Sequence, residues 1–181
     1  MPFYDIIKKI GGIKNMLKTE RLVITKLNED MAFEMFVNSN DEEIKRFLPD
    51  EVFTSLEDTK EKIIQLIKAY DSKEGPFLYP IILGENIIGY LELSKIEEGF
   101  EIGYVIYSKY RKHGYLKEAL MEFIPYIMNK LNLDKLYGVV LEDNVPSYKL
   151  LEKCDFTLVF KGEDLYQGEK KQIRKYVKIR K

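Results

Sequence analysis

Residues 101–120 read EIGYVIYSKYRKHGYLKEAL, and this segment carries the clearest structural signal in the chain. A strand pattern runs from Phe100 to Tyr107, a basic loop with one glycine follows, and a helical pattern begins at Tyr115. Backbone N–H groups in the first turn of a helix lack partners within the helix, and the helix dipole favours negative charge there. Gly114 lets the backbone approach a ligand closely, and Arg111 can form a forked, charge-assisted hydrogen bond. The sequence therefore predicts a phosphate- or pyrophosphate-binding loop.

The composition indicates a single globular domain. The chain has 181 residues, of which 45% are hydrophobic and 33% charged, as in ordinary soluble domains. One cysteine, Cys154, excludes a disulfide framework and fits a reducing compartment. No apolar run approaches the roughly 20 residues of a membrane span, and the one at the N-terminus is too short for a signal peptide. We therefore expect a cytoplasmic protein with no membrane partner.

Charge is distributed unevenly, although the net charge is only −1. Residues 28–61 contain eleven acidic and three basic residues, which gives this segment a net charge of −8. The last twelve residues contain seven basic residues and no acidic one. The two regions therefore present opposite charge to a partner.

Periodicity and turn residues predict a mixed α/β chain with a meander in its middle. We expect helices over residues 29–38, 41–47, 55–70, 116–131 and 145–154, with Pro125 kinking the fourth. We expect strands over residues 21–27, 77–83, 87–96, 100–107, 135–140, 156–160 and 173–179. No repeat or linker divides the chain, so we assign residues 1–16 to an accessory segment and residues 17–181 to one domain.

The loop at residues 111–116 resembles the pyrophosphate loop of the GNAT acetyltransferase superfamily. That loop has Gln or Arg, two variable residues, Gly, one variable residue, and Gly or Ala. Arg111 and Gly114 fit, whereas Leu116 stands where a small residue is usual. KLYGVVLEDNVPSYKLLEKCDF (135–156) resembles a later part of the same fold, and LKTERLVITKL (17–27) and ENIIGYLEL (85–93) resemble earlier parts. Over residues 17–180 the chain is similar to the branch that includes the ribosomal-protein N-terminal alanine and serine acetyltransferases.

This resemblance implies a GNAT fold, with a mixed, mostly antiparallel sheet flanked by helices. Strand 100–107 would bend away from strand 135–140, and the pantetheine arm of acetyl-CoA would lie in the gap. Backbone groups of Val105 and Tyr107 would bind this arm, with an N–H near Val105 facing the thioester oxygen. The remaining predicted cofactor-binding residues are Arg111, Lys112, His113, Gly114, Tyr115, Leu116 and Asn144. No metal is predicted, because the single histidine, His113, has no second ligand nearby.

Two residues are predicted to take part in the chemistry. Glu101 heads the strand before the loop, where carboxylates act as general base in several GNAT branches, and Glu92 is the alternative. Neighbouring carboxylates raise each other's pKa, which suits a base. The tyrosine that many GNAT enzymes use as the acid is missing, because Leu151 stands at its position. The resemblance assigns help to the leaving thiolate to Ser147, with Tyr148 as the alternative.

The resemblance implies an acetyl-CoA-dependent N-acetyltransferase, in which a primary amine attacks directly in a ternary complex. We expect a cationic peptide or protein N-terminus as the acceptor, because the acidic segment 28–61 would wall that side of the cleft. Alternatives are acetylation of a polyamine or aminoglycoside, CoA binding without turnover, and nucleic-acid binding by the basic C-terminal strand. Lysines on an edge strand also prevent aggregation, so we rank nucleic acid lowest. A homodimer is compatible with the sequence.

Overall fold

The computed structural model describes residues 17–180. The predicted accessory segment, residues 1–16, lies outside this range. Among the described residues, no helix is both long and apolar enough to cross a membrane.

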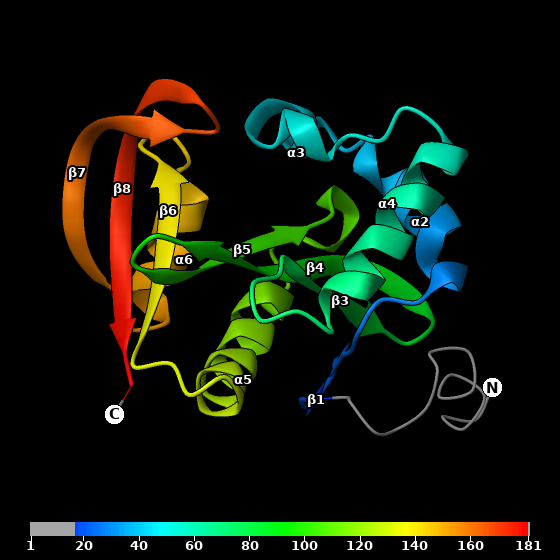
Figure 1. Cartoon of the computed structure of the whole chain (residues 1–181), viewed down its shortest axis with the longest axis horizontal. Coiled ribbons are helices and arrows are strands. Elements are labelled where there is room, and N and C mark those ends of the chain that lie inside the picture. Colours follow the sequence, from blue (N-terminus) through cyan, green and yellow to red (C-terminus); the bar gives the residue numbers. More distant parts are fainter. Residues whose placement is uncertain (1–16, 181) are drawn as a thin grey trace.

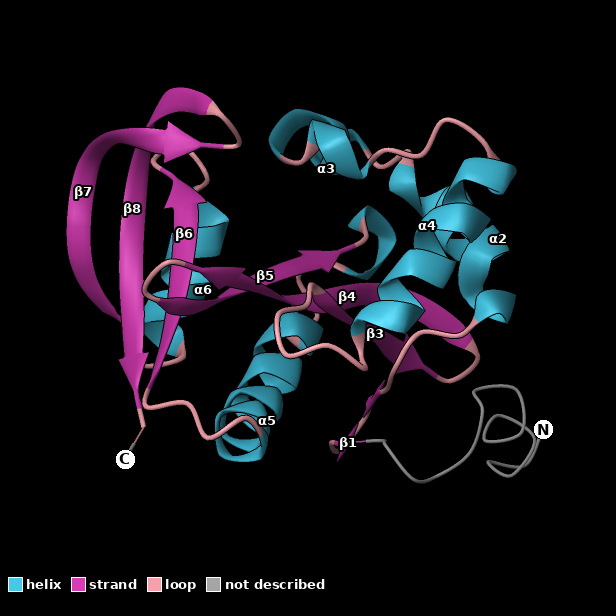
Figure 2. Ribbon diagram, in the orientation of Figure 1, coloured by secondary structure: helices cyan, strands magenta, loops and turns pink. Residues whose placement is uncertain are grey.

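A single sheet of eight strands organises the described chain, with helices on both of its faces (Figures 1 and 2). The spatial order is β1-β2-β3-β4-β5-β6-β8-β7, and every neighbouring pair is antiparallel except β5 and β6. This confirms the predicted mixed, mostly antiparallel sheet. The strands are β1 (Leu17–Lys18), β2 (Val23–Ile24), β3 (Phe77–Leu83), β4 (Asn86–Ile96), β5 (Gly99–Ile106), β6 (Lys135–Leu141), β7 (Thr157–Tyr166) and β8 (Glu169–Ile179).

A hydrophobic core lies on each face of the sheet. On one face α5 packs an apolar stripe that includes Leu120, Phe123 and Ile127 against the sheet, and α6 contributes Leu151. On the other face α2, α3 and α4 cover a second core. The α-helices are α2 (Ala32–Ser39), α3 (Glu42–Phe47), α4 (Leu56–Ala69), α5 (Tyr115–Lys130) and α6 (Val145–Lys153), with short 3₁₀ turns at Glu29–Met31, Pro49–Glu51 and Ser108–Tyr110.

The strands β5 and β6 diverge near the centre of the sheet. They pair in parallel at only one position, Glu101 with Tyr137, whereas β5 pairs with β4 over eight positions and β6 with β8 over seven. Each strand is therefore held by its other neighbour, and the gap between them opens toward the end of β5 (Figure 1). The predicted splay of these two strands is confirmed.

Gly89 allows the close approach of β4 and β5 beside this gap. A Cβ atom built on Gly89 would lie 2.1 Å from the carbonyl oxygen of Val105, which no side chain tolerates without a shift of the backbone. Gly89 pairs with Ile106 in the ladder. The geometry of β5 at the gap therefore depends on a glycine in the neighbouring strand.

Several boundaries differ from the sequence predictions. The first predicted strand is shorter than expected and covers only Val23–Ile24. The two C-terminal strands are longer than expected and form a hairpin, whose turn residues Gln167 and Gly168 have φ values of 51° and 78°. The basic strand β8 lies between β6 and β7, so it is not the edge strand, and β7 is. Helix α5 continues through Pro125 to Lys130 as a single helix.

Candidate functional site

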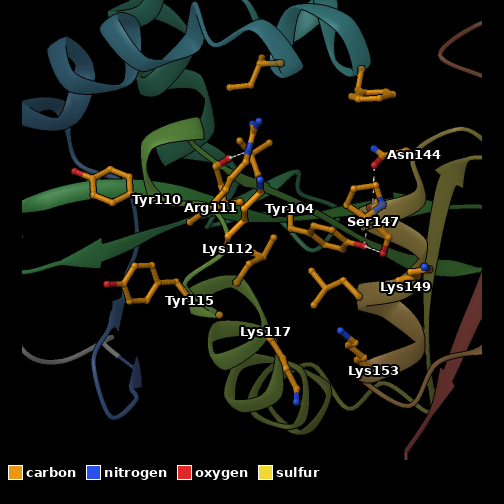
Figure 3. Close-up of a pocket in the computed structure, with 18 of the residues that line it drawn as sticks. Tyr104, Tyr110, Arg111, Lys112, Tyr115, Lys117, Asn144, Ser147, Lys149 and Lys153 are labelled. Atoms are coloured by element: carbon orange, nitrogen blue, oxygen red, sulfur yellow. Dashed lines mark hydrogen bonds between the residues drawn. The ribbon is translucent and has the colours of Figure 1, made fainter.

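A cavity of about 540 Å³ lies in the gap between β5 and β6 (Figure 3). We call it the splay cavity. Its walls come from the end of β5, the following loop, the first turn of α5, one side of α6 along its length, and the apolar side of α3. The predicted site residues that line it are Val105, Arg111, Lys112, Gly114, Tyr115, Leu116, Asn144 and Ser147. The fold thus brings most of the predicted site together.

The N-terminus of α5 opens into this cavity. Gly114 precedes the helix with φ of 79°, in the left-handed region, and it provides no side-chain cap. The first N–H that bonds back along the helix is that of Glu118, which donates to the carbonyl of Gly114 at 3.1 Å. The N–H groups of the preceding turn are those that a helix leaves for an outside acceptor. Their position at the cavity wall is suited to an anion.

The splay cavity is strongly positive. Five basic residues line it, namely Arg111, Lys112, Lys117, Lys149 and Lys153, and the lining of described residues contains no Asp or Glu. The four lysines make no ion pair within residues 17–180. Lys149 and Lys153 lie one turn apart on α6 and so share a face. Lys117, Lys149 and Lys153 were not among the predicted site residues, although the spacing of four residues between the last two on the predicted helix 145–154 indicates that they share a face.

Arg111 also stabilises the loop through contacts with Asp41 and Ile106. Its Nη2 lies 2.9 Å from Oδ1 of Asp41, and its Nε donates to the carbonyl of Ile106 at 2.9 Å. Asp41 also accepts from the N–H of Ser108 at 2.7 Å, and its side chain is only 7% exposed. The arginine and this aspartate therefore join the loop to the start of α3. The pairing spans 70 residues of sequence, and no local pattern indicates it.

His113 lies outside the lining of the splay cavity. Its ring stacks with that of Tyr115 at 5.6 Å, and its carbonyl accepts from Nη1 of Arg21 at 3.2 Å. Arg21 in turn pairs with Glu118 at 2.6 Å and lies 4.5 Å from the centre of the Tyr115 ring. The loop is thus tied to the turn between β1 and β2.

Ser147 and Tyr104 bridge the gap between α6 and β5. The Ser147 hydroxyl donates to the Tyr104 hydroxyl at 2.9 Å, and the Tyr104 hydroxyl donates to the carbonyl of Ser147 at 3.0 Å (Figure 3). Asn144 caps α6 by accepting from the N–H of Ser147 at 3.3 Å. Burial raises the pKa of Tyr104. Tyr104 was not among the predicted site residues, because strand alternation alone does not separate a cavity residue from a core residue.

Tyr148, the alternative to Ser147, is placed differently. The guanidinium of Arg174 lies 4.0 Å from the centre of its ring, and Tyr148 is not among the residues that line the splay cavity.

Glu101 lies where β5 and β6 still touch, outside the lining of the splay cavity. Burial raises its pKa to about 7, and the charges of Glu92 and Glu98 add to the rise, while a hydrogen bond from the backbone of Val139 and the charge of Lys175 oppose it. A carboxyl with this pKa can accept a proton at neutral pH.

A second cavity of about 210 Å³ lies on the face covered by α2 and α4. Ile44 lines both cavities, so they are neighbours. The side chains of Tyr107 and Glu92 line this second cavity rather than the first. The N–H of Tyr107 donates to Ile88, and its carbonyl accepts from Tyr110, so both backbone groups predicted to bind a cofactor already have partners within the chain.

A family model described as an acetyltransferase (GNAT) domain matches residues 21–157. The chain belongs to the GNAT acetyltransferase family. YnaD, an uncharacterized N-acetyltransferase of Bacillus subtilis (strain 168), is 26% identical over 141 residues, which cover 76% of this chain and 79% of that protein. A GNAT-family acetyltransferase structure from Bacillus anthracis has a TM-score of 0.77 and 25% identity, and the match covers 91% of this chain and 98% of that one.

The fold also matches that of RimL, a ribosomal L7/L12 alpha-N-protein acetyltransferase solved in complex with coenzyme A. The TM-score is 0.79 at 19% identity, and the match covers 91% of this chain and 98% of that one. The predicted resemblance is confirmed, and this GNAT protein is an acyltransferase enzyme. The roles of individual residues stay predictions.

Proposed function

We propose that this GNAT enzyme transfers the acetyl group of acetyl-CoA to a primary amine, on a cationic peptide or protein N-terminus, by direct attack in a ternary complex. The observation that carries the proposal is the splay cavity, which combines an uncapped helix N-terminus with five basic residues and no acidic lining residue.

The residues present fit the anionic end of CoA. The N-terminus of α5 offers N–H donors for a diphosphate, and the lysines of the loop, α5 and α6 supply positive charge around it. The cavity volume of about 540 Å³ falls within the range usual for cofactor-sized ligands. Beyond Glu101 the side of β5 that faces β6 has no strand partner, which leaves an extended edge for the pantetheine arm. The complex of RimL with coenzyme A supports this choice of cofactor.

The proposed chemistry needs an acceptor for one proton and a donor for another. As the amine nitrogen attacks the thioester carbon and the C–S bond breaks, Glu101 takes the proton of the amine, directly or through water. The hydroxyls of Ser147 and Tyr104 lie at the splay cavity, and one of them donates its proton to the leaving sulfur as the C–S bond breaks and then regains a proton from water. Holding both substrates in adjacent cavities supplies much of the rate acceleration.

Three observations support a cationic acceptor. The segment 28–61 carries a net charge of −8, and its helices cover the face of the sheet that holds the second cavity. Glu51 and Glu92 line that cavity, with one basic residue, Lys62. RimL, which has the same fold, is named for acetylating a protein α-amine.

Calorimetric titration with acetyl-CoA tests the cofactor site. The double variant Lys149→Gln/Lys153→Gln should bind about 5- to 30-fold more weakly, since each exposed ionic contact contributes up to about 1 kcal/mol. Lys60→Gln/Lys68→Gln, with the same charge change on exposed residues of α4, is the matched control and should bind like the parent. Absence of acetyl-CoA binding to the parent enzyme would refute the proposal.

A further inference from the structure

Two buried tyrosines line the second cavity, and their hydroxyls are available to a ligand. We call it the tyrosine cavity, lined by Tyr90, Tyr107, Glu51, Glu92 and Lys62 together with apolar side chains. Tyr90 is 6% exposed and Tyr107 3% exposed. Within residues 17–180, neither hydroxyl makes a hydrogen bond, and neither is sealed off from the cavity.

A tyrosine hydroxyl that faces open space inside the fold bonds to water or to a ligand group. Neither oxygen is cut off from such a partner, so both are able to form a hydrogen bond within the cavity. The side chains of Tyr90 and Tyr107 lie on the same face of the sheet. Tyr90 of β4 pairs with Val105, and Tyr107 follows Val105 by two residues. The cavity of about 210 Å³ is polar enough and large enough to admit a ligand group the size of one side chain.

The charged residues around the tyrosine cavity favour a positively charged ligand group. Glu51 and Glu92 line it, and Lys62 is an exposed residue of α4. The pKa of Tyr107 is raised, mainly by burial and further by the charges of Glu34, Glu51 and Asp41. A cation with N–H donors can therefore bond to the tyrosine oxygens and to the Glu92 carboxylate together.

The tyrosine cavity lies near Glu101, where the amine is proposed to lose its proton. Ile44 separates it from the splay cavity, and Glu92 lies diagonally across the sheet from Glu101, about 7–8 Å away by strand geometry. We propose that the tyrosine cavity binds a second cationic group of the acceptor, joined to the reacting amine by a short flexible chain. This inference rests on the proposed function and names its substrate class. Two kinds of acceptor carry such a second cationic group: a peptide whose first side chain is basic, and a polyamine with a distal amine.

Matched acceptors test the inference by comparing kcat/KM values. Peptides that begin with Lys or with norleucine differ only in the distal amine, and 1,4-diaminobutane and butylamine differ in the same way. The parent enzyme should prefer the dicationic member of at least one pair by about tenfold or more, as expected for charge-assisted hydrogen bonds. The pair that shows this preference identifies the source.

The double variant Tyr90→Phe/Tyr107→Phe should reduce that preference to less than about threefold, and Glu51→Gln should reduce it as well. Tyr79→Phe is the matched control, because Tyr79 is equally buried, 6% exposed, but belongs to the core on the opposite face of the sheet. It should keep the preference of the parent. Equal kcat/KM values within both pairs for the parent, or a preference that survives in the double variant, would overturn the inference.

A binding measurement separates this inference from the proposed function. Calorimetry with 1,4-diaminobutane and butylamine needs no turnover, so it reports on the tyrosine cavity even if no acceptor is acetylated. Tighter binding of the diamine, lost in Tyr90→Phe/Tyr107→Phe, supports the cavity assignment whatever the enzyme acetylates. Equal binding of both amines to the parent enzyme contradicts the assignment, even where acetyl-CoA binds and amines are acetylated.

Discussion

At the scale of a single side chain, the proposed general base, Glu101, should make the activity depend on pH. Its pKa of about 7, set mainly by burial, means that the ionised, proton-accepting form grows as the pH rises through neutrality. We expect kcat/KM to rise over this range in the parent enzyme. Glu101→Gln should lower kcat/KM by about 10²–10⁴-fold and remove this rise. Glu92→Gln is the comparison variant, and a parent-like pH profile in Glu101→Gln would assign the base to another group.

The same residue should have a measurable effect on stability. The pKa of Glu101 in the folded state lies above the usual 4.5, so its contribution to stability is full below about pH 4.5 and is lost as the pH rises through about 7. Glu101→Gln cannot ionise, so its melting temperature relative to the parent should increase between pH 5 and pH 8. Glu98→Gln is the control, because Lys175 lowers the pKa of Glu98 below its usual 4.5, so its ionisation changes only at lower pH and its relative melting temperature should stay constant between pH 5 and pH 8. No difference between pH 5 and pH 8 would contradict the burial of a titrating Glu101.

At the scale of elements, the path of β5 depends on its contact with β4. Gly89→Ala places a Cβ atom 2.1 Å from the Val105 carbonyl oxygen, so the two strands must separate. We expect a loss of about 1–3 kcal/mol in the free energy of unfolding, measured with urea. Gly103→Ala is the matched control in β5, because its Cβ would meet the nearest atom at 3.7 Å, an ordinary contact. Equal stability of the two variants would show that β4 and β5 do not need this approach.

The bridge between Tyr104 and Ser147 ties α6 to β5 across the gap. Tyr104→Phe and Ser147→Ala each remove one or both of its hydrogen bonds, at a cost of about 0.5–1.5 kcal/mol in unfolding free energy. The double variant should lose less than the sum of the two, because each single change already breaks the shared contact between the hydroxyls. Urea unfolding of the four proteins measures this coupling, and strict additivity would show that the bridge is absent in solution.

At the scale of the whole molecule, we expect the acetyl donor to bind in the basic splay cavity and the acceptor in the neighbouring tyrosine cavity. The acidic residues of the segment 28–61 should attract a cationic acceptor before it binds, and salt screens this over about 8 Å at physiological ionic strength. We expect kcat/KM for a cationic acceptor to fall as salt rises, with little change in kcat. Glu57→Lys/Glu61→Lys, on the exposed face of α4, should reproduce the fall at low salt. An acceptor of zero charge is the control, and an equal salt effect on it would contradict acceptor steering.

Much of the fold was predictable from the sequence because its signals are local. The alternation of β3, β4 and β5, the cap of α4 by Ser55 and the cap of α6 by Asn144 each depend on residues close in the chain. The same is true of the loop before α5, where Gly114 adopts its left-handed conformation directly before the first helical turn. Val105, Arg111 and Ser147, which the resemblance to the GNAT superfamily assigned to one site, line one cavity.

The tertiary structure decided what depends on contacts distant in sequence. No local pattern pairs Arg111 with Asp41, 70 residues earlier, or Tyr104 with Ser147, 43 residues later. The insertion of β8 between β6 and β7 depends on the pairing of residues 173–179 with β6, which lies far earlier in the chain. The tyrosine cavity combines residues of β3, β4, α2, α3 and α4 with Tyr107, which directly follows β5. A sequence determines which residues alternate along a strand, but only the packed sheet determines which of them face a core and which face a cavity.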